Sequence, residues 1–316
     1  STVRLYDYDG ALQPGDALTA HPKICPDTGQ LISCTQRWDS PNYWMQIFDA
    51  RGAHMNTVEV EFPRKGIIHD LQITENYVVI FYAPSFYSLE HAMKGENPFL
   101  WEPDKGTKII VIPRDGQGEN RVFETDAFFS WHFCNGFEQG GKIVIDYIWI
   151  NSIPFTQAQG TGVEKQPRRM HRMTLDLASG AVSDERFAEV FCEFSRVDER
   201  RMGNNYRYGF ATSSNRDWGD SHGYNCTGRF DFETGESKLW EYGPEANAGE
   251  PVYVANPDSE REEDGYLMCY VYNPGEGAFL SILSAGDFDN GPVAKVHIPG
   301  RVPNGFHANW MQGLTL

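Results

Sequence analysis

Short apolar segments separated by turn-forming residues recur along the whole chain, and they limit what it can fold into. Each is rich in Val, Ile, Tyr or Phe and bounded by Gly, Pro, Asn or Asp; they span residues 77–84, 108–113, 142–150 and 265–273. Segments of this length and composition are typical of β-strands. Helix signals are weak: the best are at 85–95, which ends on a glycine suited to a helix C-cap, and a short turn at 184–190. The pattern predicts an all-β protein with few helices.

Three similar turns indicate a repeated unit. Residues 24–32, 175–183 and 230–239 each place an acidic residue and a small hydroxyl residue before Gly, between two short apolar stretches. The acidic and hydroxyl side chains can bond the turn backbone, and Gly can adopt the positive φ that the turn needs. Hairpins that recur once per several tens of residues favour a β-propeller over a sandwich or a barrel. Because the spacing is irregular, the repeats alone leave those two alternatives open.

Composition and charge narrow the class of protein. The 316 residues suit one large domain, and 31 Gly, 18 Pro and 14% aromatic residues argue against a helical bundle. A formal net charge of -17 repels phosphate backbones and anionic membrane surfaces, so nucleic acid is not an expected partner. The apolar runs are too short for a membrane span, and no signal peptide is recognisable. Six cysteines without a CxxC pair are expected to be reduced thiols, which places the protein in the cytoplasm.

Four histidines, far apart in the sequence, lie in strand-like or turn-rich segments of their own. Neutral imidazole is the commonest protein ligand for a transition metal. In a propeller the innermost strands of successive blades line a central channel, so histidines from distant blades can meet on its axis. We therefore predict a metal site that only the folded protein assembles, from His21, His69, His132 and His307.

A site built from four imidazoles has no charged ligand, so acidic partners are expected on the outer ring nitrogens. Glu193 and Glu250 are candidates, because each stands in otherwise apolar surroundings. Cys134 follows His132 by two residues but is interpreted as a buried thiol. A lone histidine on a strand is usually structural, and this interpretation is given to His54, His91, His171, His222 and His297.

Six segments of the sequence, taken together, resemble those of a known protein family. The segments TAHPKICPDTGQL, HDLQITENYVVI, FFSWHFCNGFEQGGKIVID, CEFSRVDERRMGNNYRYGF, GEPVYVA and GFHANW together resemble the carotenoid cleavage oxygenases, non-haem iron enzymes that split alkenes. The resemblance covers essentially the full chain in the same order. YDYDGALQPGDALTAHPK and SLEHAMKGENPFLWEPDKGTKIIVIPRDGQGENR further resemble the branch that cleaves lignostilbenes and phenylpropenes such as isoeugenol.

The resemblance implies a seven-bladed β-propeller with few helical insertions and Fe(II) on its axis, held by the four histidines. It pairs Glu193 with His132 and Glu250 with His307. The family's third glutamate lies upstream of the first histidine in relatives and has no match here, so the partner of His69 is missing. Residues 1–316 are accordingly expected to be a single propeller catalytic domain that lacks its N-terminal blades.

The activity implied by the resemblance is cleavage of a C=C bond by O2, which acts as the co-substrate. The expected substrate is a small hydrophobic or phenolic alkene, a stilbenoid or phenylpropene that yields aromatic aldehydes. Phe129, Ile153 and Phe155 occupy places where relatives line the substrate channel, although each could equally be an ordinary core residue. Two alternatives stay open: an enzyme that cleaves apocarotenoids or carotenoids, and a non-catalytic propeller that serves as a binding scaffold.

Overall fold

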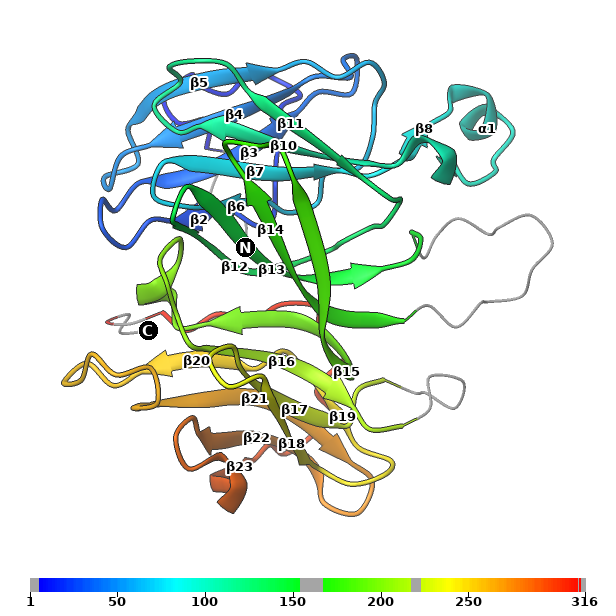
Figure 1. Cartoon of the computed structure of the whole chain (residues 1–316). Helices are drawn as coiled ribbons and strands as arrows, with labels where there is room; N and C mark the ends of the chain where they lie inside the picture. Colours follow the sequence, from blue (N-terminus) through cyan, green and yellow to red (C-terminus); the bar gives the residue numbers. More distant parts are fainter. Residues whose placement is uncertain (1–5, 154–166, 217–222, 312, 314–316) are drawn as a thin grey trace.

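The computed structural model describes residues 6–153, 167–216, 223–311 and 313. Apart from short 3-10 helices, the regular secondary structure of these residues consists of strands and one helix, α1 (Leu89–Met93). The helix lies in the connection between β8 (Ser85–Tyr87) and β9 (Phe99–Trp101) (Figure 1). The predicted all-β class is confirmed. No helix in these residues is long and apolar enough to cross a membrane.

Two antiparallel sheets come first along the chain. The first contains β1 (Ala17–Leu18), β2 (Lys23–Ile24), β3 (Leu31–Gln36), β4 (Tyr43–Phe48) and β5 (His54–Val60). The second contains β6 (Gln72–Ile73), β7 (Tyr77–Tyr82), β10 (Thr107–Pro113) and β11 (Arg121–Thr125). In both sheets the shortest strands, β1 and β2 in one and β6 in the other, lie at one edge.

A seven-stranded sheet follows, made of β12 (Phe133–Gln139), β13 (Lys142–Ile150), β14 (Arg168–Asp176), β15 (Val182–Val197), β16 (Tyr208–Ser214), β17 (Cys226–Asp231) and β18 (Glu236–Glu241). The 16-residue β15 pairs with β14 through residues 182–191 and with β16 through residues 191–197. It therefore joins two four-stranded units. The predicted helical turn at 184–190 is wrong, because this segment is part of the strand β15 and residues 184–186 pair with β14.

The last sheet contains β19 (Asn247–Ala248), β20 (Val252–Ala255), β21 (Gly265–Asn273), β22 (Gly277–Ser284) and β23 (Pro292–His297). The described residues after β23 form no strand. Ala308 and Asn309 in this final segment hydrogen-bond to Arg196 at the end of β15. Residues 308 and 309 are thus docked on the seven-stranded sheet.

Consecutive sheets pack face to face, which explains the uninterrupted apolar runs in the sequence. In β7, Val78 and Ile80 contact the first sheet, whereas Val79 and Phe81 contact the seven-stranded sheet. β10 and β13 likewise divide their side chains between two core clusters. Strands buried on both faces read as continuous apolar segments. This arrangement of blades is the β-propeller that the turns and the resemblance predicted.

The three predicted hairpins are confirmed and share one geometry. Gly29, Gly180 and Gly235 adopt φ of 68°, 77° and 77°. Each glycine N–H donates to the carbonyl four residues earlier, at 2.8, 2.9 and 2.9 Å. In the turn before Gly180, the Asp176 carboxylate accepts from two backbone N–H groups, as expected for turn-capping acids. All six cysteines are buried and unpaired.

Candidate metal centre

Four of the predicted site residues lie where an edge strand of a sheet begins or breaks, whereas His307 lies on the C-terminal segment that follows the last strand. His21 occupies the gap between β1 and β2, His69 stands three residues before β6, and His132 directly precedes β12. Glu250 occupies the gap between β19 and β20. Residues at such breaks are released from the sheet ladder, so their side chains can turn toward the middle of the molecule.

Glu193 is placed by an irregularity in β15. The pairing of β15 with β16 shifts register after this residue, and Phe194 has a φ of 52°, in the left-handed region that non-glycine residues rarely adopt. A bulge of this kind redirects side chains out of the sheet. It brings the Glu193 carboxylate to His132 and the Phe194 ring to within 5.3 Å of both His132 and His307.

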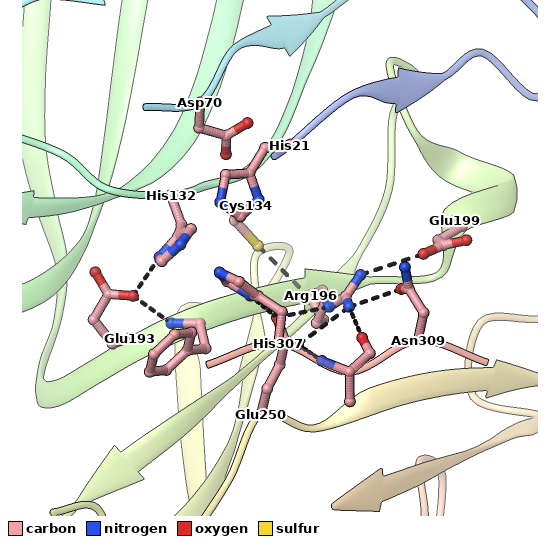
Figure 2. Close-up of polar contacts among 12 residues, drawn as sticks. His21, Asp70, His132, Cys134, Glu193, Arg196, Glu199, Glu250, His307 and Asn309 are labelled. Atoms are coloured by element: carbon pink, nitrogen blue, oxygen red, sulfur yellow. Dashed lines mark hydrogen bonds and ion pairs between the residues drawn. The ribbon is translucent and has the colours of Figure 1, made fainter. Parts of the chain in front are cut away.

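The four predicted histidines come together. One ring nitrogen from each lies within 4.8 Å of the others, and Nε2 of His21 is 3.0 Å from Nε2 of His69. The rings of His21 and His307 are 4.5 Å apart, and those of His132 and His307 are 4.9 Å apart (Figure 2). They come from three sheets and the C-terminal segment, separated by up to 286 positions (307 minus 21) in the sequence.

Glu193 fixes the His132 ring. Its Oε2 lies 2.5 Å from Nδ1 of His132 and also accepts from the Phe194 N–H at 2.6 Å. Burial would lower the pKa of His132, but the Glu193 carboxylate outweighs burial and raises it. Burial would correspondingly raise the pKa of Glu193, and His132 lowers it instead. With Nδ1 as the donor, the Nε2 lone pair of His132 points away from the glutamate.

Glu250 holds His307 together with a residue that the sequence reasoning missed, Arg196. The carboxylate accepts from Nδ1 of His307 at 3.1 Å and from Nε and Nη2 of Arg196 at 2.9 and 3.2 Å (Figure 2). The Ala308 N–H donates to the same carboxylate at 2.7 Å. Burial would raise the pKa of Glu250, but His307 and then Arg196 lower it. Arg196 also donates to the Ala308 carbonyl and to Oδ1 of Asn309, at 2.9 Å for the latter.

His21 and His69 differ from the other two histidines, because no described carboxylate is hydrogen-bonded to either ring. Burial lowers the pKa of His21 to about 3 and that of His69 to about 4. Both imidazoles are therefore neutral near pH 7. Thr19 fixes the backbone of His69, since its hydroxyl donates to the His69 carbonyl at 2.7 Å.

The donor set fits a transition metal. Within the described residues, Nε2 of His132 is buried without a hydrogen-bond partner, which is costly unless something binds its lone pair. Two imidazole nitrogens about 2.1 Å from one ion and at right angles to each other would be roughly 3.0 Å apart. The His21–His69 separation of 3.0 Å matches this. Neutral imidazoles suit iron, copper, nickel or zinc, and only oxygen-rich sites suit calcium or magnesium.

Two cavities adjoin the cluster. One, of about 390 Å³, has a mixed polar and apolar lining that includes Lys23, Asp70, Arg196 and Glu199 as well as three of the histidines. The other, of about 350 Å³, has His307 at its side, and its wall includes five aromatic side chains: Phe194, Tyr224, Tyr270, Tyr272 and Phe306. Trp131 adds a further aromatic ring next to the site, 4.7 Å from that of His69. The cluster thus adjoins one cavity with several charged side chains in its wall and one with several aromatic side chains.

The structure describes two of the three proposed channel residues. Phe129 and Ile153 are 1% and 0% exposed, in the core cluster shared by the two halves of the seven-stranded sheet, and neither lines the two cavities described above. Phe129 packs behind Trp131, at 4.6 Å between ring centroids. Phe155 lies outside the described residues. A substrate-binding role for these three residues stays a prediction. Cys134 is buried, as expected.

Comparison with known proteins gives the family. Residues 1–312 match the family described as retinal pigment epithelial membrane protein. The chain is 30% identical to apocarotenoid-15,15'-oxygenase of Synechocystis sp., over 99% of this chain and 67% of that protein, and 31% identical to isoeugenol monooxygenase of Pseudomonas nitroreducens, over 97% and 68%. The lignostilbene dioxygenase structure from Pseudomonas brassicacearum aligns with a TM-score of 0.90 at 28% identity, over 99% of this chain and 69% of that one.

The chain therefore belongs to the carotenoid cleavage oxygenase family, as the sequence resemblance predicted. It is an enzyme of the family's kind, a non-haem iron oxygenase that acts on carbon–carbon double bonds. Its relatives include enzymes named for apocarotenoids, for carotenoids and for isoeugenol, at similar levels of identity.

Proposed function

We propose that this protein binds ferrous iron through His21, His69, His132 and His307 and uses O2 to cleave the alkene of a stilbenoid or phenylpropene. The observation that carries the proposal is the cluster itself: four imidazole nitrogens within 4.8 Å of one another, one of them buried without a partner. When bound there, iron would supply the means to bind and activate O2 beside an electron-rich double bond.

The protein's own residues fix the tautomer, orientation and protonation state of the imidazoles before a metal ion binds. Glu193 and Glu250 accept from the Nδ1 atoms of His132 and His307, so each imidazole keeps one tautomer and one orientation. The lowered pKa values of His21 and His69 keep their lone pairs free of protons at neutral pH. The site therefore needs little rearrangement to bind a cation.

Aromatic side chains next to the histidine cluster favour a flat, conjugated substrate. Phe194 lies 5.3 Å from the rings of His132 and His307, and Trp131 lies 4.7 Å from His69. Aromatic rings stack favourably on planar unsaturated molecules and exclude water from them. An apocarotenoid shares this flatness, and the relatives named for apocarotenoids make it the second candidate substrate.

The test is reconstitution of the whole protein with ferrous iron under anaerobic conditions, followed by assays with isoeugenol, resveratrol and an apocarotenal. We expect bound iron, O2 consumption and aromatic aldehyde products, and loss of iron and products in His132→Ala. The matched control is His171→Ala, on β14, where the imidazole pairs with Asp184 at 3.2 Å away from the cluster. Turnover of the apocarotenal alone would replace the substrate class, and absence of iron enrichment would favour a binding scaffold.

A further inference from the structure

Asp70, which sequence reasoning missed, lies beside the candidate metal centre. It directly follows His69 and is 6% exposed. A carboxylate so deeply buried must be compensated by hydrogen bonds or charges. The partners of Asp70 all belong to segments that carry the clustered histidines.

The first partner is Lys23, two residues after His21. Its Nζ donates to Oδ1 of Asp70 at 2.7 Å, and the Lys23 and Asp70 side chains are only 11% and 3% exposed. This ion pair connects β2 to the segment before β6. A buried pair of this kind holds its two segments firmly, because separating them would leave a charge unpaired in the interior.

The second partner is the backbone of Phe133, the residue after His132. Its N–H donates to Oδ2 of Asp70 at 2.9 Å, and Oδ1 also accepts from the Leu71 N–H at 2.7 Å. Both carboxylate oxygens are therefore occupied. Figure 2 shows Asp70 beside His21 and His132, on the opposite side of His132 from Glu193.

We propose that Asp70 is a positioning residue for the metal centre: one carboxylate ties together the three segments that present His21, His69 and His132. Glu193 and Glu250 orient single imidazoles, whereas Asp70 fixes the spacing between three of them through their backbones. This inference rests on the proposed function, since it takes the four histidines to be the metal ligands. It also explains how His21 and His69, which lack a described carboxylate partner, keep a defined separation.

The test is cobalt binding by the whole protein, because cobalt(II) reports its ligand geometry through visible absorption without any turnover. In Asp70→Asn an N–H₂ group replaces one of the two acceptor oxygens, so at least one of the three hydrogen bonds is lost while size is conserved. We expect affinity for cobalt to fall by about 10- to 100-fold, with an altered spectrum, as for other residues that orient metal ligands.

The matched control is Asp146→Asn. Asp146 is likewise a buried carboxylate with an arginine partner, Arg172, at 2.8 Å, and a hydroxyl donor, Tyr206, at 2.6 Å, but neither of these hydrogen bonds ties it to a histidine segment. The Asp146→Asn variant should have a lower melting temperature than the parent protein but the same cobalt affinity and spectrum. An equal loss of cobalt affinity in both variants would overturn the inference, as would parental affinity and spectrum in Asp70→Asn.

If Asp70→Asn fails to fold, Lys23→Met carries the test, because it removes only the link to the His21 segment. We expect weaker cobalt binding with a changed spectrum, and parental binding would refute the role of the ion pair. A failure of this inference can be distinguished from a failure of the proposed function. A parent that binds cobalt but, with iron, cleaves no alkene contradicts the function and leaves the role of Asp70 measurable; a parent that binds neither metal contradicts both.

Discussion

The attachment of the C-terminal segment depends on Arg196, and replacing Arg196 by lysine tests this dependence. The guanidinium donates to both oxygens of Glu250 and to oxygens of Ala308 and Asn309 at the same time. A lysine ammonium keeps the charge but lacks the planar fork, so it cannot reach all of these acceptors. Arg196→Lys is therefore expected to loosen the segment that carries His307.

The size of the effect follows from the contacts. The substitution removes about two charge-assisted hydrogen bonds, and at a side chain that is 19% exposed we take roughly 1 kcal/mol for each, less than for fully buried ones. A total of about 2 kcal/mol corresponds to roughly a 30-fold larger fraction of molecules with the segment undocked. Hydrogen exchange of a peptide covering residues 306–311, in metal-free protein, measures this fraction.

A matched control exists in Arg172→Lys. Arg172 donates to both oxygens of Asp146 through Nε and Nη2, at 2.8 Å each, but has no contact with the C-terminal segment. It should destabilise the protein without faster exchange at 306–311. Unchanged exchange of that peptide in Arg196→Lys, or an equal increase in Arg172→Lys, would refute the assignment of Arg196 as the anchor.

Three further outcomes are expected. Glu193→Gln should weaken iron or cobalt binding by about 10- to 100-fold in a metal titration, because the ring of His132 loses its charged partner; parental affinity would contradict this. Metal-free protein should lose stability in urea as pH falls from 6.5 toward 4, since unfolded chains take up protons that His21 and His69, with folded pKa values of about 3 and about 4, exclude. A double alanine variant at these two positions that keeps the full pH slope would argue against that origin. Phe279→Ala, in the fully buried core of the last sheet, should cost about 3–5 kcal/mol of unfolding free energy while metal binding persists.

The fold could be predicted from the sequence in those segments whose local residue pattern agrees with their packing in the structure. Strands such as β13 are apolar on both faces because a neighbouring sheet covers each face, and such runs stand out in the sequence. The hairpin glycines were equally clear, because a positive φ is a local requirement. The first half of β15 was not: its charged, solvent-facing residues have no strong strand pattern, and only pairing with β14 makes it a strand.

The candidate site was predictable in its imidazoles and two glutamates through family resemblance, and not in its connecting groups. Asp70 reaches Phe133 across 63 positions, and Arg196 reaches Ala308 across 112. Contacts so distant leave no spacing pattern in a single sequence. The available signal was a charged residue within an apolar segment, GIIHDLQIT around Asp70, which the reasoning applied to Glu193 and Glu250 alone.

The location of His307 has a consequence for how the protein is made. Three of the four clustered imidazoles lie in the first half of this chain, whereas the fourth lies on a segment that follows every described strand. Because synthesis proceeds from the N-terminus, a growing chain presents three histidines long before the last one leaves the ribosome. In the proposed iron site, coordination by all four histidines can therefore form only after this segment has been translated. A chain that ends before His307 would contain the residues of every described strand yet only three of the clustered imidazoles, so metal retention would distinguish finished molecules from truncated ones.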